Sequence, residues 1–259
     1  MAIQQVRRGS GKPLILVHGL GSSRRAWGLI GLALAEQREV ITPDLPGHGD
    51  SPAEADSATF AGVARSFDEW LTAEGLVGAD MVGSSLGGRV VLEMARRGRS
   101  GAVVALDPGG FWEGWERQFT YGSLIGSAAL LRTLGPALPF IAHNVAARSA
   151  LLVQLSNRPW AWPGDLVENE LAGIAATKTF DALLADLAFG ELQEGPAAPG
   201  SGPVTIGWGR HDRLLLPVQA ERACAAFPGA RLHWFEHSAH FPMLDEPDET
   251  IKLIRSVLA

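Results

Sequence analysis

The chain has 259 residues, of which 46% are hydrophobic and 19% are charged, a composition typical of a soluble globular protein with one large core. Its formal net charge of -6 offers no basic surface for a phosphate backbone, so we expect no nucleic-acid partner. The single cysteine, Cys224, excludes an internal disulfide. No apolar run approaches the ~18 residues of a membrane span, and none near Met1 resembles a signal peptide, so we expect a cytoplasmic protein without membrane contact.

Short apolar runs alternate with longer helical patterns in the first 110 residues, which is typical of a parallel sheet covered on both faces. Four such runs predict strands at residues 14–17, 39–42, 79–83 and 102–106. The segments between and after them predict helices at residues 22–37, 59–74 and 85–97. Residues 3–8 leave room for only one short strand before the first parallel one.

The alternation stops at residue 111. From there to about residue 194 the sequence has helical patterns and no convincing strand, and a linker rich in proline and glycine follows. Strands are predicted again at residues 204–208 and 231–235, each followed by a helix. This pattern indicates a helical insertion in one sheet domain, without an internal repeat.

Residues 1–110 and 200–259 are therefore predicted to form an α/β core, with a mostly parallel central sheet and helices on both faces. Residues 111–199 are predicted to form a helical cap with its linker. An open α/β sheet binds its ligand beyond the carboxyl ends of its strands. We therefore expect the cap to cover a ligand site at that edge.

The strongest chemical signal is Gly83-Ser84-Ser85-Leu86-Gly87, a G-x-S-x-G motif directly after a predicted strand and directly before a predicted helix. Small flanking residues allow a sharp, strained turn that lifts the central side chain above the sheet. The alternative is a glycine and serine turn that only caps a helix. We predict that Ser85 is a nucleophile, while Ser84 occupies a position that points away.

A serine nucleophile needs a base and an acid that orients the base. His240 lies in a loop after the last predicted strand and is preferred over the neighbouring His237. Asp212 follows the strand at residues 204–208 and is the predicted acid. Asp107, at the end of an earlier strand, is its competitor, although a role as a turn residue is favoured for it.

An oxyanion needs two donors close to the nucleophile. The first is predicted to be the backbone N–H of Leu86, which follows Ser85 at the start of a helix. The second is predicted to be the backbone N–H of Leu20, in the loop after the strand at residues 14–17. His18, in the same loop, is interpreted as a structural residue rather than a proton carrier.

Taken jointly, His18-Gly19, the run from Asp44 to Ser51, the serine turn, Asp212 and His240 resemble the α/β-hydrolase superfamily over nearly the whole chain. This resemblance implies an eight-stranded type of core sheet, a helical cap and a Ser-His-Asp triad. The chain departs from the pattern at its start, where the leading edge of the sheet is abbreviated. The insertion carries no motif that assigns a subfamily, so the resemblance indicates a mechanism more clearly than a substrate.

The expected activity is hydrolysis of an ester-like bond of a small, fairly apolar substrate, as in a carboxylesterase. The predicted insertion is rich in aromatic residues that can line an apolar pocket. The residues predicted to bind substrate are Trp27, Arg89, Trp112 and Trp115. No phosphate loop or zinc-ligand spacing is present, so we expect no cofactor and no metal.

Two alternatives remain open from the sequence. The run from Ser85 to Val90 resembles the menaquinone-pathway synthase that eliminates pyruvate, which implies a lyase with the same triad. In that resemblance Arg89 binds a substrate carboxylate and the cap supplies further cationic groups. The other alternative is a non-catalytic receptor for a small ligand on the same fold.

Overall fold

The computed structural model describes residues 3–258. Seven strands of this described part of the chain form one sheet in the order β1-β3-β2-β4-β5-β6-β7. Their bounds are β1 (Gln5–Arg8), β2 (Pro13–Val17), β3 (Glu39–Pro43), β4 (Asp80–Ser84), β5 (Val103–Leu106), β6 (Val204–Gly209) and β7 (Arg231–Phe235). Only β1 is antiparallel to its neighbour, so the predicted, mostly parallel sheet is confirmed.

The resemblance implied an eight-stranded type of sheet, whereas the described residues form seven strands. The reason is the short leading segment, which forms the single strand β1 beside β3. Among residues 3–258, β1 is the outermost strand on that side of the sheet.

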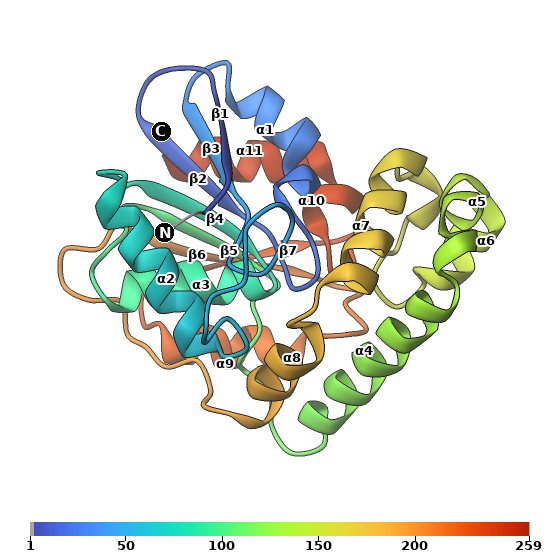
Figure 1. Ribbon diagram of the computed structural model, residues 1–259. Coiled ribbons are helices and arrows are strands. Elements are labelled where there is room, and N and C mark those ends of the chain that lie inside the picture. Colours follow the sequence, from blue (N-terminus) through green and yellow to red (C-terminus); the bar gives the residue numbers. More distant parts are fainter. Residues whose placement is uncertain (1–2, 259) are drawn as a thin grey trace.

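Helices cover both faces of the sheet (Figure 1). Helix α1 (Gly28–Leu34) and helix α11 (Pro247–Leu258) pack on one face, where β2 directs Leu14 and Leu16. Helices α2 (Phe60–Ala73), α3 (Leu86–Arg96) and α9 (Val218–Ala226) pack on the other face, against Ile15 and Val17. Alternate side chains of a strand point to opposite faces, so apolar residues in succession are what a sheet buried on both sides requires.

Two helical segments of the core are each divided into shorter elements. The segment at residues 22–37 forms a 3-10 turn, η1 (Arg24–Trp27), followed by α1, and the hydroxyl of Ser23 caps the turn by accepting the Arg25 N–H. The helical segment at residues 242–258 is divided into α10 (Pro242–Asp245) and α11. Pro247 explains the split, because a proline restricts the preceding residue to non-helical dihedral angles.

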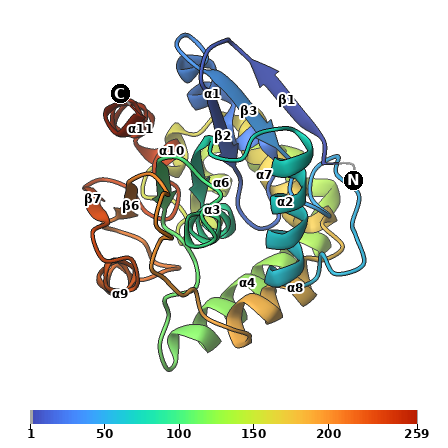
Figure 2. The same ribbon diagram turned by 90° about the vertical axis from the view of Figure 1, so that its left-hand side faces the viewer.

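Residues 111–199 form helices and turns without a strand, all within the part of the chain that the structure describes. The insertion contains α4 (Glu116–Thr133), η2 (Gly135–Ala137), α5 (Leu138–His143), α6 (Val145–Leu151), η3 (Pro159–Ala161), α7 (Gly164–Ala176) and α8 (Phe180–Phe189). Helix α4 packs beside α7 and α8 (Figure 2). Among residues 3–258 no single helix is long and apolar enough to cross a membrane; only α4 with the segment after it passes that test, as a pair bent by 77°.

Candidate active site

Ser85 sits in a strained turn between β4 and α3. Its backbone has φ 56° and ψ -114°, a region that non-glycine residues rarely adopt. The glycines of the motif are required by close backbone packing: a Cβ added at Gly83 would lie 2.1 Å from the Gly87 carbonyl oxygen. A Cβ added at Gly87 would lie 2.2 Å from the Val17 carbonyl oxygen. The start of α3 therefore packs directly against β4 and β2, and a side chain at either glycine would not fit.

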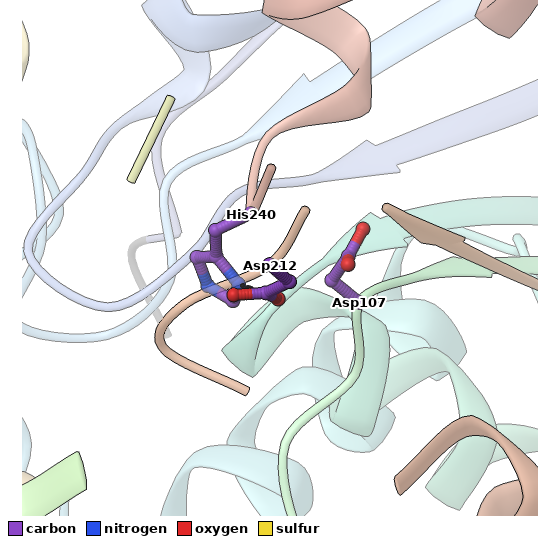
Figure 3. A group of neighbouring side chains, drawn as sticks. All are labelled: Asp107, Asp212 and His240. Carbon is purple, nitrogen blue, oxygen red and sulfur yellow. Dashed lines mark hydrogen bonds and ion pairs between the residues drawn. The ribbon is translucent and has the colours of Figure 1, made fainter. Parts of the chain in front are cut away.

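The structure brings Ser85, His240 and Asp212 into one hydrogen-bonded chain. The distance from the Ser85 Oγ to the His240 Nε2 is 3.0 Å, and from the His240 Nδ1 to the Asp212 Oδ2 it is 2.8 Å. Figure 3 shows that Asp212 and His240 come from separate loops and meet side by side. With Nδ1–H donating to the carboxylate, Nε2 is left to accept the serine O–H, which is the tautomer that a general base needs.

The candidate acid and the candidate base are both fixed by backbone contacts. The Asp212 Oδ1 accepts the N–H groups of Leu214 and Leu215, at 2.8 and 2.9 Å. The His240 N–H donates to the carbonyl of Leu155, in the insertion, at 3.1 Å. Both the His240 and Asp212 side chains are buried, so their hydrogen bonds are little weakened by water.

The rival residues are placed differently. The side chain of Ser84 is buried and its hydroxyl has no partner among residues 3–258, whereas His237 is exposed. Asp107 directly follows β5 with φ 42°, as the turn interpretation expects, and it makes a further contact through its side chain. Its side chain is fully buried, and its Oδ1 accepts the N–H of Gly209 at 2.9 Å.

The loop predicted to supply an oxyanion donor lies against the serine. A Cβ added at Gly19 would be 3.3 Å from the Ser85 Cβ and 3.9 Å from its Oγ. Leu20 and Leu86 both line the pocket that Ser85 opens into. Within residues 3–258, neither of their N–H groups donates to another protein group, so both are available to an oxygen atom at the site.

Buried histidines hold this loop in place. The His18 Nε2 accepts the Leu45 N–H at 2.9 Å, and its Nδ1 lies 2.8 Å from the Gly19 carbonyl oxygen. Burial lowers the pKa of His18 to about 4, so the ring is neutral at neutral pH. The ring of His48 packs beside that of His18, and burial lowers the pKa of His48 to about 3. These contacts agree with the interpretation of His18 as a structural residue.

The pocket beside Ser85 is mainly apolar. Its walls include Trp112, one of the residues proposed to bind substrate, and several leucines: Leu124 from α4, Leu184 and Leu187 from α8, and Leu214 and Leu215 from the loop after β6. The sequence interpretation missed these leucines. Leucines abound in the insertion helices, so residue type alone does not mark them; the nearness of Leu214 and Leu215 to Asp212 was the one available signal.

Two of the residues predicted to bind substrate do not line the pocket at Ser85. Trp27 is fully buried in the core cluster that α1 covers, together with Leu14 and Ile30, and does not line the pocket at Ser85. The 3-10 turn explains this, because it ends at Trp27 and turns the side chain into the core. Trp115 is 63% exposed and packs edge-on against Phe119, so it faces solvent.

Arg89 does line the pocket, although it lies in the first turn of α3, where surface residues are common. Its side chain is buried, with Nη2 donating to the Glu191 carbonyl at 2.7 Å and its guanidinium 3.8 Å from the centre of the Phe60 ring. Burial lowers the pKa of Arg89 to about 10, and the group remains charged at neutral pH. It is the single cationic side chain among the described residues that line this pocket.

Comparisons with known proteins find similarity over nearly the whole chain. A model described as "Alpha/beta hydrolase family" matches residues 14–253. An uncharacterised protein of Mycobacterium tuberculosis is 30% identical over 95% of this chain and 75% of that protein. A pimeloyl-[acyl-carrier protein] methyl ester esterase of Methylococcus capsulatus is also 30% identical, over 97% of this chain and 96% of that protein. The structure of a thermophilic esterase from Thermogutta terrifontis matches with a TM-score of 0.74 and 22% identity, over 99% of this chain and 92% of that one.

Proposed function

Because the chain belongs to the alpha/beta hydrolase family, and because one hydrogen-bonded chain links Ser85, His240 and Asp212, we propose that it is a serine hydrolase. It cleaves an ester-like bond of a small, fairly apolar substrate through an acyl-enzyme. The observation that carries this proposal is the 3.0 Å contact between the Ser85 Oγ and the His240 Nε2. That contact supplies the base that a serine hydroxyl needs at neutral pH.

In the first half of the reaction the Ser85 Oγ attacks the substrate carbonyl carbon while the His240 Nε2 takes the hydroxyl proton. Asp212 holds the imidazole in its tautomer and stabilises the positive ring that forms. The N–H groups of Leu20 and Leu86 bind the oxygen on which negative charge develops. His240 then returns the proton to the leaving alcohol, and the bond between carbonyl carbon and alcohol oxygen breaks.

In the second half a water molecule attacks the acyl-enzyme, and the same groups act in reverse. His240 takes the water proton and returns it to the Ser85 Oγ, which leaves as a hydroxyl. The products are a carboxylic acid and the regenerated enzyme.

The leucine-rich pocket supports an apolar acyl or alcohol group on the substrate, since such groups gain from leaving water. The ester class is supported by the relative from Methylococcus capsulatus, whose name describes a methyl ester esterase. The cellular compartment proposed for this reaction is the cytoplasm.

The lyase alternative finds less support. It requires further cationic groups from the insertion, and the arginines there are Arg117, Arg132, Arg148 and Arg158. None of them is among the pocket-lining residues. Arg132 pairs with the exposed Asp181, and Arg148 donates to backbone carbonyls within the insertion. A receptor role is also disfavoured, because a binding protein has no need of a complete triad.

The test is turnover of nitrophenyl acetate, butyrate and octanoate by wild-type protein, Ser85→Ala and the matched Ser84→Ala. We expect turnover by wild type and Ser84→Ala, and none above background by Ser85→Ala. Equal turnover in wild type and Ser85→Ala would exclude Ser85 as the nucleophile. No ester turnover by any of the proteins, together with elimination of pyruvate from the menaquinone precursor by wild type, would favour the lyase.

A further inference from the structure

Asp107 has an unusual backbone. It follows β5 with φ 42°, and in residues 3–258 the only other non-glycine residue with a positive φ is Ser85. Side chains with a Cβ avoid this region, so the conformation persists only where surrounding contacts hold it. Both strained residues lie at the carboxyl end of the sheet, one at the nucleophile position and one beside its acid.

The contacts of Asp107 tie it to the loop that carries Asp212. Its Oδ1 accepts the N–H of Gly209, at the end of β6 and three residues before Asp212. Side-chain oxygens of Asp107 and Asp212 and a ring nitrogen of His240 all lie within 4.8 Å of one another (Figure 3). No Lys or Arg forms an ion pair with Asp107 anywhere in residues 3–258.

Two neighbouring carboxyl groups form a hydrogen bond only if one of them carries a proton. The carboxylate oxygens of Asp212 already accept three N–H donors: those of Leu214 and Leu215 and the His240 Nδ1–H. Asp107 accepts one, and its buried Oδ2 has no donor within the described chain. Donors stabilise the ionised form, so the proton belongs on Asp107.

The surrounding charges act in the same direction. Burial raises the pKa of Asp107 well above its usual range, and the nearby carboxylates of Asp212 and, more weakly, Asp245 raise it further. A cation shared by the cluster is less favoured, because both ring nitrogens of His240 are already in hydrogen bonds to Asp212 and Ser85.

We propose that Asp107 is protonated at neutral pH and donates its proton to the Asp212 carboxylate, as a positioning residue for the acid. The pair then presents one negative charge to His240 instead of two, and the donated hydrogen bond fixes the plane in which Asp212 meets the Nδ1–H. The placement of the proton is independent of the reaction, whereas its effect on turnover rests on the proposed function.

The proton is tested by stability. In the window between the unfolded carboxyl pKa of about 3.9 and the raised folded value, the folded state holds a proton that the unfolded chain has released. Wild type must therefore lose stability relative to Asp107→Asn as the pH rises, since asparagine does not titrate. We expect the difference in Tm to grow in favour of Asp107→Asn by about 3 °C or more between pH 5 and pH 8. The matched control is Asp248→Asn, which removes an exposed carboxyl from α11 and should show no such growth.

The positioning role is tested by kinetics. Asparagine keeps an acceptor for the Gly209 N–H and a donor for Asp212, whereas alanine removes both. We expect Asp107→Ala to lower kcat about 10- to 100-fold and Asp107→Asn to restore it to within about threefold. In the pH profile of kcat/KM, the apparent pKa of the acid limb should agree within ~0.3 pH unit between wild type and Asp107→Asn.

Two results would overturn the proposal. A constant difference in Tm from pH 5 to pH 8 would mean that folding leaves the protonation of Asp107 unchanged. If the apparent pKa of the acid limb were ~1 unit lower in Asp107→Asn than in wild type, an ionised Asp107 would be stabilising the charged imidazole of His240. If wild type turned over no ester, the Tm comparison would still decide where the proton lies.

Discussion

The edge of the core sheet and the helical insertion contribute to the candidate site in different ways. The core holds Ser85, His240 and Asp212 through directional hydrogen bonds and close backbone contacts. The insertion contributes apolar side chains such as Leu124 and Leu184, and carries most of the exposed large hydrophobic residues of the described chain. Directional contacts fix the relative positions of the three side chains, while an apolar pocket wall can accommodate substrates of different shapes. Changes in the core should therefore alter kcat, and changes in the insertion should alter substrate preference.

The largest effect is expected for Asp212, the proposed acid of the candidate triad. Asp212→Asn leaves the His240 Nδ1–H without its carboxylate, so kcat should fall about 10,000-fold while the Tm changes little. Steady-state kinetics and thermal unfolding measure the two quantities, with Asp248→Asn as the control. Retention of a tenth or more of the activity would transfer the role of acid to Asp107.

A pair of glycine substitutions compares the two regions in stability. In Gly87→Ala the new Cβ would meet the Val17 and His18 carbonyl oxygens, at 2.2 and 2.5 Å, and we expect a loss of roughly 3 kcal/mol. In Gly126→Ala, on the exposed side of α4, nothing lies within 4 Å of the new Cβ, and we expect a gain of about 0.5–1 kcal/mol. Urea unfolding measures both; similar losses in the two variants would contradict the contrast.

The core loops should also be sensitive to acid. The folded pKa of His18 is lowered to about 4, so its contribution to stability is present above the unfolded value near 6.5 and lost as the pH falls through 4. The loss is on the order of 3 kcal/mol. His18→Asn should be less stable than wild type at pH 8 but lose less between pH 7 and pH 4, as followed by urea unfolding at each pH. Parallel losses would mean that His18 titrates freely.

The smallest effect is expected in the pocket wall. Leu124→Trp should lower kcat/KM for nitrophenyl octanoate about tenfold relative to acetate, because the larger side chain fills space available to a long acyl group. Leu130→Trp, on the same helix but 47% exposed, is the matched control and should keep the wild-type ratio. A uniform loss on both esters would place Leu124 outside the acyl site.

The fold was predictable from the sequence because apolar runs mark its strands. The residues of the candidate triad were predictable because each lies in a turn that follows one of those strands. Ser85, Asp212 and His240 follow the strands β4, β6 and β7. The glycines around Ser85 are a further signal, because a side chain at Gly83 or Gly87 would collide with the backbone.

The side chains that line the pocket were predictable only in part: Arg89 and Trp112 lie there, whereas Trp27 and Trp115 do not. Trp27 and Trp115 are aromatic, as a residue that lines an apolar pocket can be, but the direction of a side chain depends on where its helix begins. The 3-10 turn directs Trp27 into the core, and Trp115 is exposed.

The closeness of Asp107 to Asp212 could not be predicted from the sequence for another reason. It depends on β5 lying beside β6 in parallel register, with Leu106 opposite Gly207. These strands are separated by the whole insertion, so the sequence offers no local signal for their pairing. Proton sharing between the two carboxyl groups is a property of that tertiary contact.

Covalent labelling of the nucleophile tests the central claim most directly. Wild-type protein treated with a fluorophosphonate should gain the mass of one adduct, and peptide mapping should place it on Ser85 rather than Ser84. Ser85→Ala should gain none, and His240→Gln should label far more slowly because the hydroxyl has lost its base. An adduct on another residue, or ester turnover without any adduct at Ser85, would contradict the account.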